Sequence, residues 1–176
     1  MSKILDLRQK RSDVWDKAKA FLDERSGENG LMSGEDTAIY ERMEQEVVDL
    51  GHAIEREERA AEIERELRSC AEADVALVLT TGGTGFSPRD VTPEATAAVC
   101  ERMAPGIPEA MRAASMQITD RACLSREAAG ICGRTLVVNL PGSPKAALEN
   151  VSAVIGPIAH GLRILRGGQA DCAAGE

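Results

Sequence analysis

The sequence has very few aromatic residues. Its 176 residues include one Trp, one Tyr and two Phe, whereas proteins that bind single-stranded nucleic acids stack bases on aromatic side chains. The net charge of −8 also lacks the excess of Lys and Arg that binding to phosphate backbones requires. Both shortages argue against a general nucleic-acid-binding protein.

Long apolar runs and paired cysteine motifs are missing as well. No stretch approaches the roughly 20 apolar residues that cross a membrane, and the first ten residues contain no apolar signal-peptide core. The cysteines are odd in number and have no Cys-x-x-Cys spacing. They indicate reduced thiols in a cytoplasmic protein, and neither a disulfide framework nor a zinc site. They are Cys70, Cys100, Cys123, Cys132 and Cys172.

Charge and glycine are distributed unevenly along the chain. Residues 1–70 hold 12 Lys and Arg, 18 Asp and Glu, and four of the 16 glycines. This shift predicts a charged helical segment over residues 1–69 and a glycine-rich α/β domain over residues 70–166. The small and polar residues 167–176 predict a disordered tail.

The first segment predicts two helices. Apolar residues at alternating three- and four-residue spacing form a seam like that of a coiled coil, interrupted by Arg11. Residues 26–30 break this helix, and a long acidic helix follows from the cap at Ser33 to about Ser69. We expect an antiparallel helical hairpin or a coiled coil with another chain. Such a segment is either a solubilising arm or an oligomerisation element. The seam is Ile4, Leu7, Val14, Ala18 and Phe21.

A glycine-rich loop follows the clearest strand. Residues 75–79 are an unbroken apolar run, which predicts a strand buried on both faces, as in a parallel sheet. Gly82, Gly83 and Gly85 permit positive φ and can turn successive N–H groups toward one anion. Because ligands in α/β sheets bind beyond the carboxyl ends of strands, we predict a phosphate or nucleotide loop. The alternative is a turn that only reverses the chain.

A carboxylate separates this loop from the next helix. Thr92 is a candidate N-cap and Pro93 suits the first helical position, so a helix is predicted from Thr92 to about Met103. Asp90 can hold Mg²⁺ against phosphates, since Mg²⁺ prefers one or two carboxylates together with phosphate oxygens. Alternatively, Asp90 pairs with Arg89 or caps the helix.

A second loop follows a second strand. A hairpin about Cys132-Gly133 leads into the strand Thr135–Leu140, and Pro141-Gly142-Ser143-Pro144-Lys145 comes next. If the two strands are parallel neighbours, their loops lie side by side and form a composite anion site. Ser143 can instead be an ordinary N-cap of the helix over residues 146–166, which we expect to be interrupted at Gly156-Pro157.

These motifs resemble one family in order and spacing. With Ala104-Pro105-Gly106 and Leu124-Ser125-Arg126, the two loops are similar to the molybdopterin adenylyltransferases, the MogA/MoaB-like group that includes the gephyrin G domain. The resemblance covers about residues 70–166 and implies a partial three-layer α/β domain with a parallel sheet. A complete member carries a further N-terminal half with a second aspartate, and no residue before Cys70 matches it. An open sheet edge is therefore expected.

The resemblance implies a function in molybdenum cofactor biosynthesis. Family members use Mg²⁺ and ATP to adenylylate molybdopterin, and they are commonly trimers. Because the half with the second aspartate is absent, an inactive remnant is the alternative to an active nucleotidyltransferase. The resemblance assigns catalytic roles to Asp90, also the Mg²⁺ ligand, and Ser143, and ligand binding to Thr81, Gly82, Gly83, Thr84, Gly85, Pro141, Gly142 and Lys145.

The first segment has a weaker likeness. Its opening Leu7-Arg8-Gln9-Lys10-Arg11 and second acidic helix resemble the delta (scaffolding) region of tailed-phage major capsid proteins. This likeness implies an alternative function as a non-enzymatic oligomerisation or scaffolding protein.

Overall fold

The computed structural model describes residues 3–26 and 31–168. The chain divides into two compact units, residues 1–59 and 60–176, and each is described by itself. The helix break predicted at residues 26–30 and the tail predicted from Gly167 lie largely outside the described residues. No helix within the described ranges is both long and apolar enough to cross a membrane.

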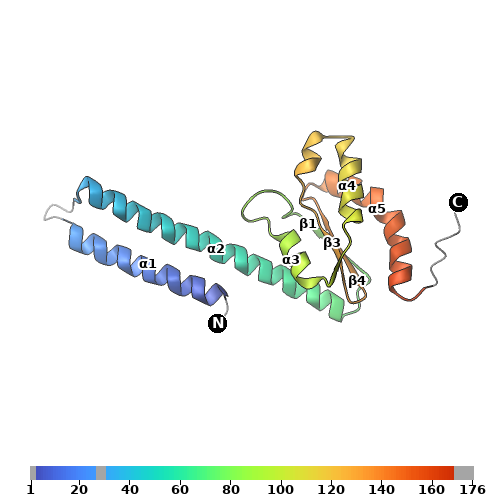
Figure 1. The fold of residues 1–176 in the computed structure, drawn as a ribbon, viewed down its shortest axis with the longest axis horizontal. Coiled ribbons are helices and arrows are strands. Elements are labelled where there is room, and N and C mark those ends of the chain that lie inside the picture. The colour runs from blue at the N-terminus through green and yellow to red at the C-terminus, as the bar shows by residue number, and fades with distance from the viewer. Residues whose placement is uncertain (1–2, 27–30, 169–176) are drawn as a thin grey trace. The chain divides into compact units, whose positions relative to one another are not determined.

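The first unit is a helical hairpin. Helix α1 (Lys3–Arg25) lies antiparallel to the first part of α2 (Gly34–Glu72) (Figure 1). The predicted seam faces inward, with Ala18 fully buried. Arg11, which interrupts the seam, lies against Gly51 of α2, where a Cβ would be 3.6 Å from Cζ of Arg11. The predicted helical hairpin is therefore confirmed.

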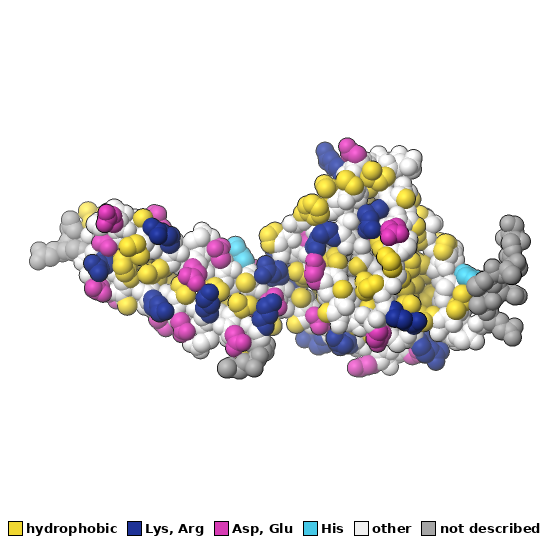
Figure 2. Space-filling view, in the orientation of Figure 1, with side chains coloured by type: hydrophobic (Ala, Val, Ile, Leu, Met, Phe, Trp, Pro, Cys, Tyr) yellow, Lys and Arg dark blue, Asp and Glu magenta, His cyan; other side chains and the backbone are white. Residues whose placement is uncertain are grey.

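Ion pairs follow the antiparallel arrangement. Lys3 Nζ lies 2.7 Å from Glu57 Oε1, and Lys10 Nζ lies 3.3 Å from Glu46 Oε1. Figure 2 shows both signs of charge interspersed over this unit. Since exposed pairs each contribute only about 0–1 kcal/mol, they set the alignment of the helices more than their stability.

The second unit is built on a four-stranded mixed sheet in the order β1-β4-β3-β2. Strand β1 (Leu77–Thr81) is parallel to β4 (Thr135–Leu140), with Leu77 opposite Leu136. The predicted parallel pairing of these two strands is confirmed. Strand β3 (Ala129–Cys132) is antiparallel to β4, because the tight turn at Gly133 (φ +58°) reverses the chain between them. Strand β2 (Arg102–Met103) is antiparallel to β3.

Helices cover both faces of the sheet. All six residues of β4 are buried. Val138 and its alternate neighbours pack on α4 (Gly106–Met116) and α5 (Pro144–Leu165). Val137 packs on the opposite face against Val99 of α3 (Thr92–Val99) and Leu67 in the last turns of α2. A short 3-10 helix, η1 (Asp120–Leu124), follows α4. The structure therefore has the predicted three-layer α/β class.

One strand prediction and one helix prediction are wrong in detail. Strand β1 is not buried on both faces, since 41% of the Leu79 surface is exposed. Its position explains this, because β4 is its only partner in the described sheet. The helix predicted to reach Met103 ends at Val99, because the backbone N–H groups of Glu101 and Ala104 pair with β3.

A third difference concerns α5. The predicted interruption at Gly156-Pro157 is wrong, because α5 runs unbroken through both residues. Both are exposed, while Val154 and Ile158 on either side are buried. Packing of the two buried side chains on the sheet therefore holds the helix together across a proline that alone would weaken it.

The described cysteines, which include Cys100, are free thiols, and Cys172 lies outside the described residues. Burial, with Cys132 and Glu101 nearby, raises the pKa of Cys100 to about 11. At pH 8 only roughly 0.1% of this thiol is ionised, and the thiolate is the form that alkylates.

Iodoacetamide should therefore modify Cys100 very slowly at pH 8. Its rate should rise with pH until about pH 11, whereas exposed Cys123 should react readily. Peptide mass spectrometry after timed labelling of the folded protein measures both sites separately. Equal labelling of Cys100 and Cys123 at pH 8 would contradict the prediction.

Candidate functional site

The glycine loop leaves β1 in a conformation that depends on glycine. Gly82 and Gly83 have φ of +85° and +67°, and the N–H of Gly82 donates to the Leu140 carbonyl at 2.9 Å. The hydroxyl of Thr92 donates to the Gly82 carbonyl at 3.0 Å. These bonds attach the loop both to β4 and to the start of α3.

Thr92 therefore does not have its predicted role. The N-cap position of α3 is Val91, and no side chain caps this helix. Thr92 is the first helical residue and is 6% exposed. Its hydroxyl and N–H both bind the glycine loop, at Gly82 and Gly83, so it stabilises the loop rather than the helix end.

The two predicted loops lie side by side. A Cβ on Gly142 would come 3.3 Å from Cα of Gly82. This closeness follows from the parallel pairing of β1 and β4, whose carboxyl ends reach the same edge of the sheet. Backbone amides from both loops can thus converge on one ligand.

Ser143 occupies the N-cap position of α5, but its side chain makes no capping hydrogen bond. The alternative of an ordinary capping serine therefore does not describe its hydroxyl, which is exposed beside Gly142. Lys145 follows in the first turn, where its ammonium lies 3.9 Å from Glu149 Oε1 and its side chain is 81% exposed. Both side chains are accessible to a ligand over the second loop.

Asp90 is half-buried at the end of the glycine loop. Its Oδ2 accepts a hydrogen bond from the Ser87 N–H at 3.0 Å, and a Cβ on Gly85 would lie 2.9 Å from the same oxygen. Glycine at position 85 thus makes room for this carboxylate. Within the described ranges, Asp90 neither pairs with Arg89 nor caps α3, and its Oδ1 has no protein partner. One carboxylate oxygen is therefore available to a cation.

The remaining residues of the loop differ in exposure. Thr81 is exposed at the end of β1, whereas Thr84 is 5% exposed and its carbonyl accepts from the Arg126 N–H at 2.8 Å. Thr84 is therefore part of the protein interior. In the part of the chain that the structure describes, no group of three or more His, Cys, Asp or Glu residues could hold a metal ion. A Mg²⁺ ion here would need phosphate oxygens besides Asp90.

Arg126 holds the glycine loop in place, although sequence reasoning assigned it no role. Its Nε donates to the Gly85 carbonyl at 2.7 Å. Its other guanidinium nitrogens bind the Asp90 carbonyl and the Glu94 carboxylate. The guanidinium therefore fixes the path of the chain on both sides of the Asp90 side chain. The only signal for it in the sequence was its place in Leu124-Ser125-Arg126.

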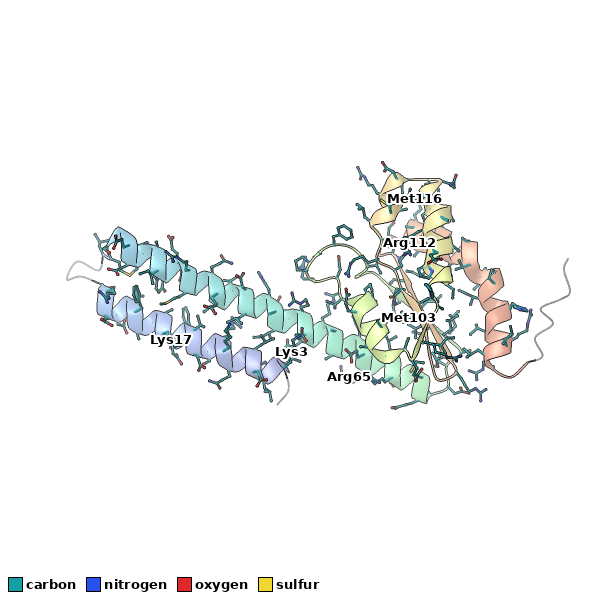
Figure 3. All side chains as sticks on the ribbon, in the orientation of Figure 1. Lys3, Lys17, Arg65, Met103, Arg112 and Met116 are labelled. Carbon is teal, nitrogen blue, oxygen red and sulfur yellow. The ribbon has the colours of Figure 1, made fainter. Side chains whose placement is uncertain are left out.

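A separate cavity of about 200 Å³ lies beside the second loop. It is lined by α4, η1, the chain before β3, and the start of α5. Glu127 lines it and is only 5% exposed. Burial raises the pKa of Glu127, while the Ser125 hydroxyl and Arg112 (labelled in Figure 3) partly oppose this shift. No local pattern in the sequence marked Glu127, because its burial depends on elements far apart in the chain.

The sequence that carries these two loops matches a known protein family. The family described as "Probable molybdopterin binding domain" matches residues 36–160. The chain belongs to this family.

Relatives and solved structures agree with this membership. The molybdopterin adenylyltransferase of Helicobacter pylori is 45% identical over 101 residues, which are 57% of each chain. Gephyrin of Dictyostelium discoideum is 51% identical over 89 residues, 51% of this chain and 12% of gephyrin. The crystal structure of MoaB from Thermus thermophilus has 46% identity and a TM-score of 0.58, covering 61% of this chain and 69% of that one.

This family member spans little more than half the length of the adenylyltransferase relative from Helicobacter pylori. The family match covers the α/β part with its two loops and also begins within α2, at residue 36. The likeness of the first segment to phage scaffolding regions stays a prediction.

Proposed function

We propose that this chain acts in molybdenum cofactor biosynthesis, where it transfers AMP from Mg-ATP to molybdopterin. The main support is one observation: a positive-φ glycine loop and a Pro-Gly-Ser loop meet at the carboxyl ends of two adjacent parallel strands. Membership of the molybdopterin-binding family and the names of relatives such as the Helicobacter pylori enzyme support the choice of substrate.

In this proposal the first loop binds the nucleotide. The backbone N–H groups of Gly83 to Gly85 donate to phosphate oxygens, a geometry that glycine permits. Asp90 binds Mg²⁺ through its available oxygen, and Arg126 keeps Asp90 in position through the neighbouring carbonyl. The ion, when bound, neutralises negative charge on the phosphates.

The second loop binds the other substrate. Gly142 allows close approach, the Ser143 hydroxyl donates to the terminal phosphate of molybdopterin, and Lys145 adds a positive charge at the rim. That phosphate oxygen attacks the α-phosphorus of ATP and forms a new P–O bond. The bond from the α-phosphorus to the bridging oxygen breaks, and pyrophosphate leaves with the electron pair. The protein contributes positioning and charge stabilisation, as in other phosphoryl-type transfers.

We propose that the two parts of the chain indicated by the composition have different roles. Residues 1–69 form a helical arm, residues 70–166 form the cytoplasmic substrate-binding domain, and the chain works as a homo-oligomer, by resemblance a trimer. A neighbouring subunit or another chain would then supply the second carboxylate that complete members carry.

Product formation tests the proposed function. The purified full chain, folded by circular dichroism, should transfer label from α-³²P-ATP to molybdopterin. The transfer should require Mg²⁺ and disappear with EDTA. Chromatography of the labelled product is the measurement, and a sample without protein is the control. A folded sample that yields no adenylylated product would contradict the proposal.

The second candidate is a non-enzymatic assembly protein. One observation favours it: in the first unit 43% of the Trp15 surface is exposed, and Trp15 lines a cavity of about 400 Å³ with Val47 and Ile54. Apolar surface of this kind is typical of helices that associate with another copy. Absence of AMP transfer, together with a stable oligomer, would favour this candidate.

A further inference from the structure

Strand β4 carries one amide side chain among its buried residues. Asn139 is 0% exposed, and the other residues of β4 are aliphatic apart from Thr135. The Nδ2 of Asn139 donates to Oγ1 of Thr80 at 2.9 Å and to Oγ1 of Thr96 at 2.8 Å. Thr80 belongs to β1 and Thr96 to α3. One side chain therefore joins three elements of the second unit.

The burial of this amide is not explained by stability alone. The Oδ1 of Asn139 makes no hydrogen bond to any described residue, and a buried polar atom without a partner costs free energy. An apolar side chain such as that of Val137, which is equally buried in the same strand, would avoid this cost. Hydrogen bonds, however, have direction and fix the relative position of packed elements, which apolar contact does less well.

Thr96 links Asn139 to the glycine loop through α3. Thr96 is 0% exposed and lies four residues after Thr92, on the same face of the helix. The hydroxyl and the N–H of Thr92 bind the carbonyls of Gly82 and Gly83. Because α3 has only eight residues, a shift of the helix at Thr96 also displaces Thr92. The position of the loop thus depends on the bond between Thr96 and Asn139.

We infer that Asn139 is a positioning residue: it fixes α3 against the sheet and, through Thr92, sets the path of the glycine loop. Its second bond, to Thr80, fixes β1 two residues before Gly82. The inference rests on the proposed function, in which the loop binds the phosphates of ATP. Asn139 itself is too deeply buried to contact a substrate, so it acts only through the elements that it joins.

Thr96 offers a matched pair of variants for testing this inference. Thr96→Val keeps the shape of the side chain and removes the hydroxyl, whereas Thr96→Ser keeps the hydroxyl. Thr96→Val should speed hydrogen exchange about five- to tenfold in residues 80–96, which include the hydrogen-bonded N–H groups of Gly82 and Thr92. Thr96→Ser should exchange like the wild type. Mass spectrometry of peptides from the full chain, without ligand, measures the exchange, and peptides from α1 are the internal reference.

A double variant separates positioning from stability. Thr96→Val combined with Asn139→Leu replaces both partners by apolar groups of similar shape, which costs little stability. Its urea midpoint should therefore be near that of the wild type, while exchange in residues 80–96 should stay as fast as in Thr96→Val. Asn150→Leu is the control, because it removes another buried amide (3% exposed) from α5, on the opposite face of the sheet. It should lower stability without faster exchange in residues 80–96.

Titration with Mg-ATP then tests the link to the nucleotide. The Kd should rise about five- to tenfold in Thr96→Val and in the double variant, and stay within a factor of two in Thr96→Ser. Wild-type exchange in Thr96→Val, or a uniform increase over the whole second unit, overturns the positioning role. Wild-type affinity in a double variant with fast exchange overturns the link to ATP. A wild type that binds no ATP but shows hydroxyl-dependent exchange contradicts only the proposed function.

Discussion

Replacing Asp90 with asparagine is expected to weaken Mg²⁺-dependent ATP binding about ten- to a hundredfold, because loss of a charged contact costs roughly 1.5–3 kcal/mol. Asparagine keeps the shape and the oxygen that accepts from the Ser87 N–H. It removes the negative charge that, in our proposal, holds the ion against the phosphates. Isothermal titration of the full chain with ATP, with and without Mg²⁺, measures the effect.

The Asp90 variant needs a charge-matched control. Asp120→Asn removes the same charge from an exposed position in η1, so its affinity should stay within a factor of two of the wild type. Residual ATP binding without Mg²⁺ should be similar in all three proteins, because the glycine loop keeps its amides. Unchanged Mg²⁺-dependent affinity in Asp90→Asn would show that the ion is bound elsewhere.

Replacing Gly83 with alanine should have the largest effect on the loop itself. The new Cβ would lie 2.2 Å from Oγ1 of Thr92, and the backbone has φ of +67°. The left-handed conformation alone costs a non-glycine residue about 1–2 kcal/mol, and the contact with a buried side chain adds to it. We expect a loss of roughly 2–4 kcal/mol in the free energy of unfolding, together with loss of ATP binding.

Alanine variants at two other glycines separate the cost of the left-handed backbone from the cost of the steric contact. Gly133 also has positive φ (+58°) but has open space where a Cβ would lie, and Gly106 has open space without positive φ. In urea unfolding, the loss of unfolding free energy should be largest for Gly83→Ala, smaller for Gly133→Ala and near zero for Gly106→Ala. Thr92→Ala in the Gly83→Ala background should recover part of the stability by removing Oγ1. A Gly83→Ala variant as stable as Gly133→Ala would contradict the steric argument.

Several features follow from residues that are close together in the chain. Apolar spacing predicted α1 and α2, the apolar runs predicted β1 and β4, and the glycines predicted the loop after β1. Local patterns suffice here because a helix or a tight turn depends on the conformational preferences of neighbouring residues. Even the proximity of Gly82 to Gly142 could be predicted, since two parallel strands end at the same edge of the sheet.

Other features required contacts between distant residues. Arg126 binds the carbonyls of Gly85 and Asp90, 41 and 36 positions away, and Glu127 is buried by elements that the fold brings together. The pairing of β2 with β3 shortened α3, and the place of β1 at the sheet edge exposed Leu79. No local pattern encodes these outcomes, because burial and hydrogen bonding of a side chain depend on which distant segments pack against it. The amino-acid sequence thus specified the glycine loop and the Pro-Gly-Ser loop, while tertiary packing decided which side chains support them and created the Glu127 cavity.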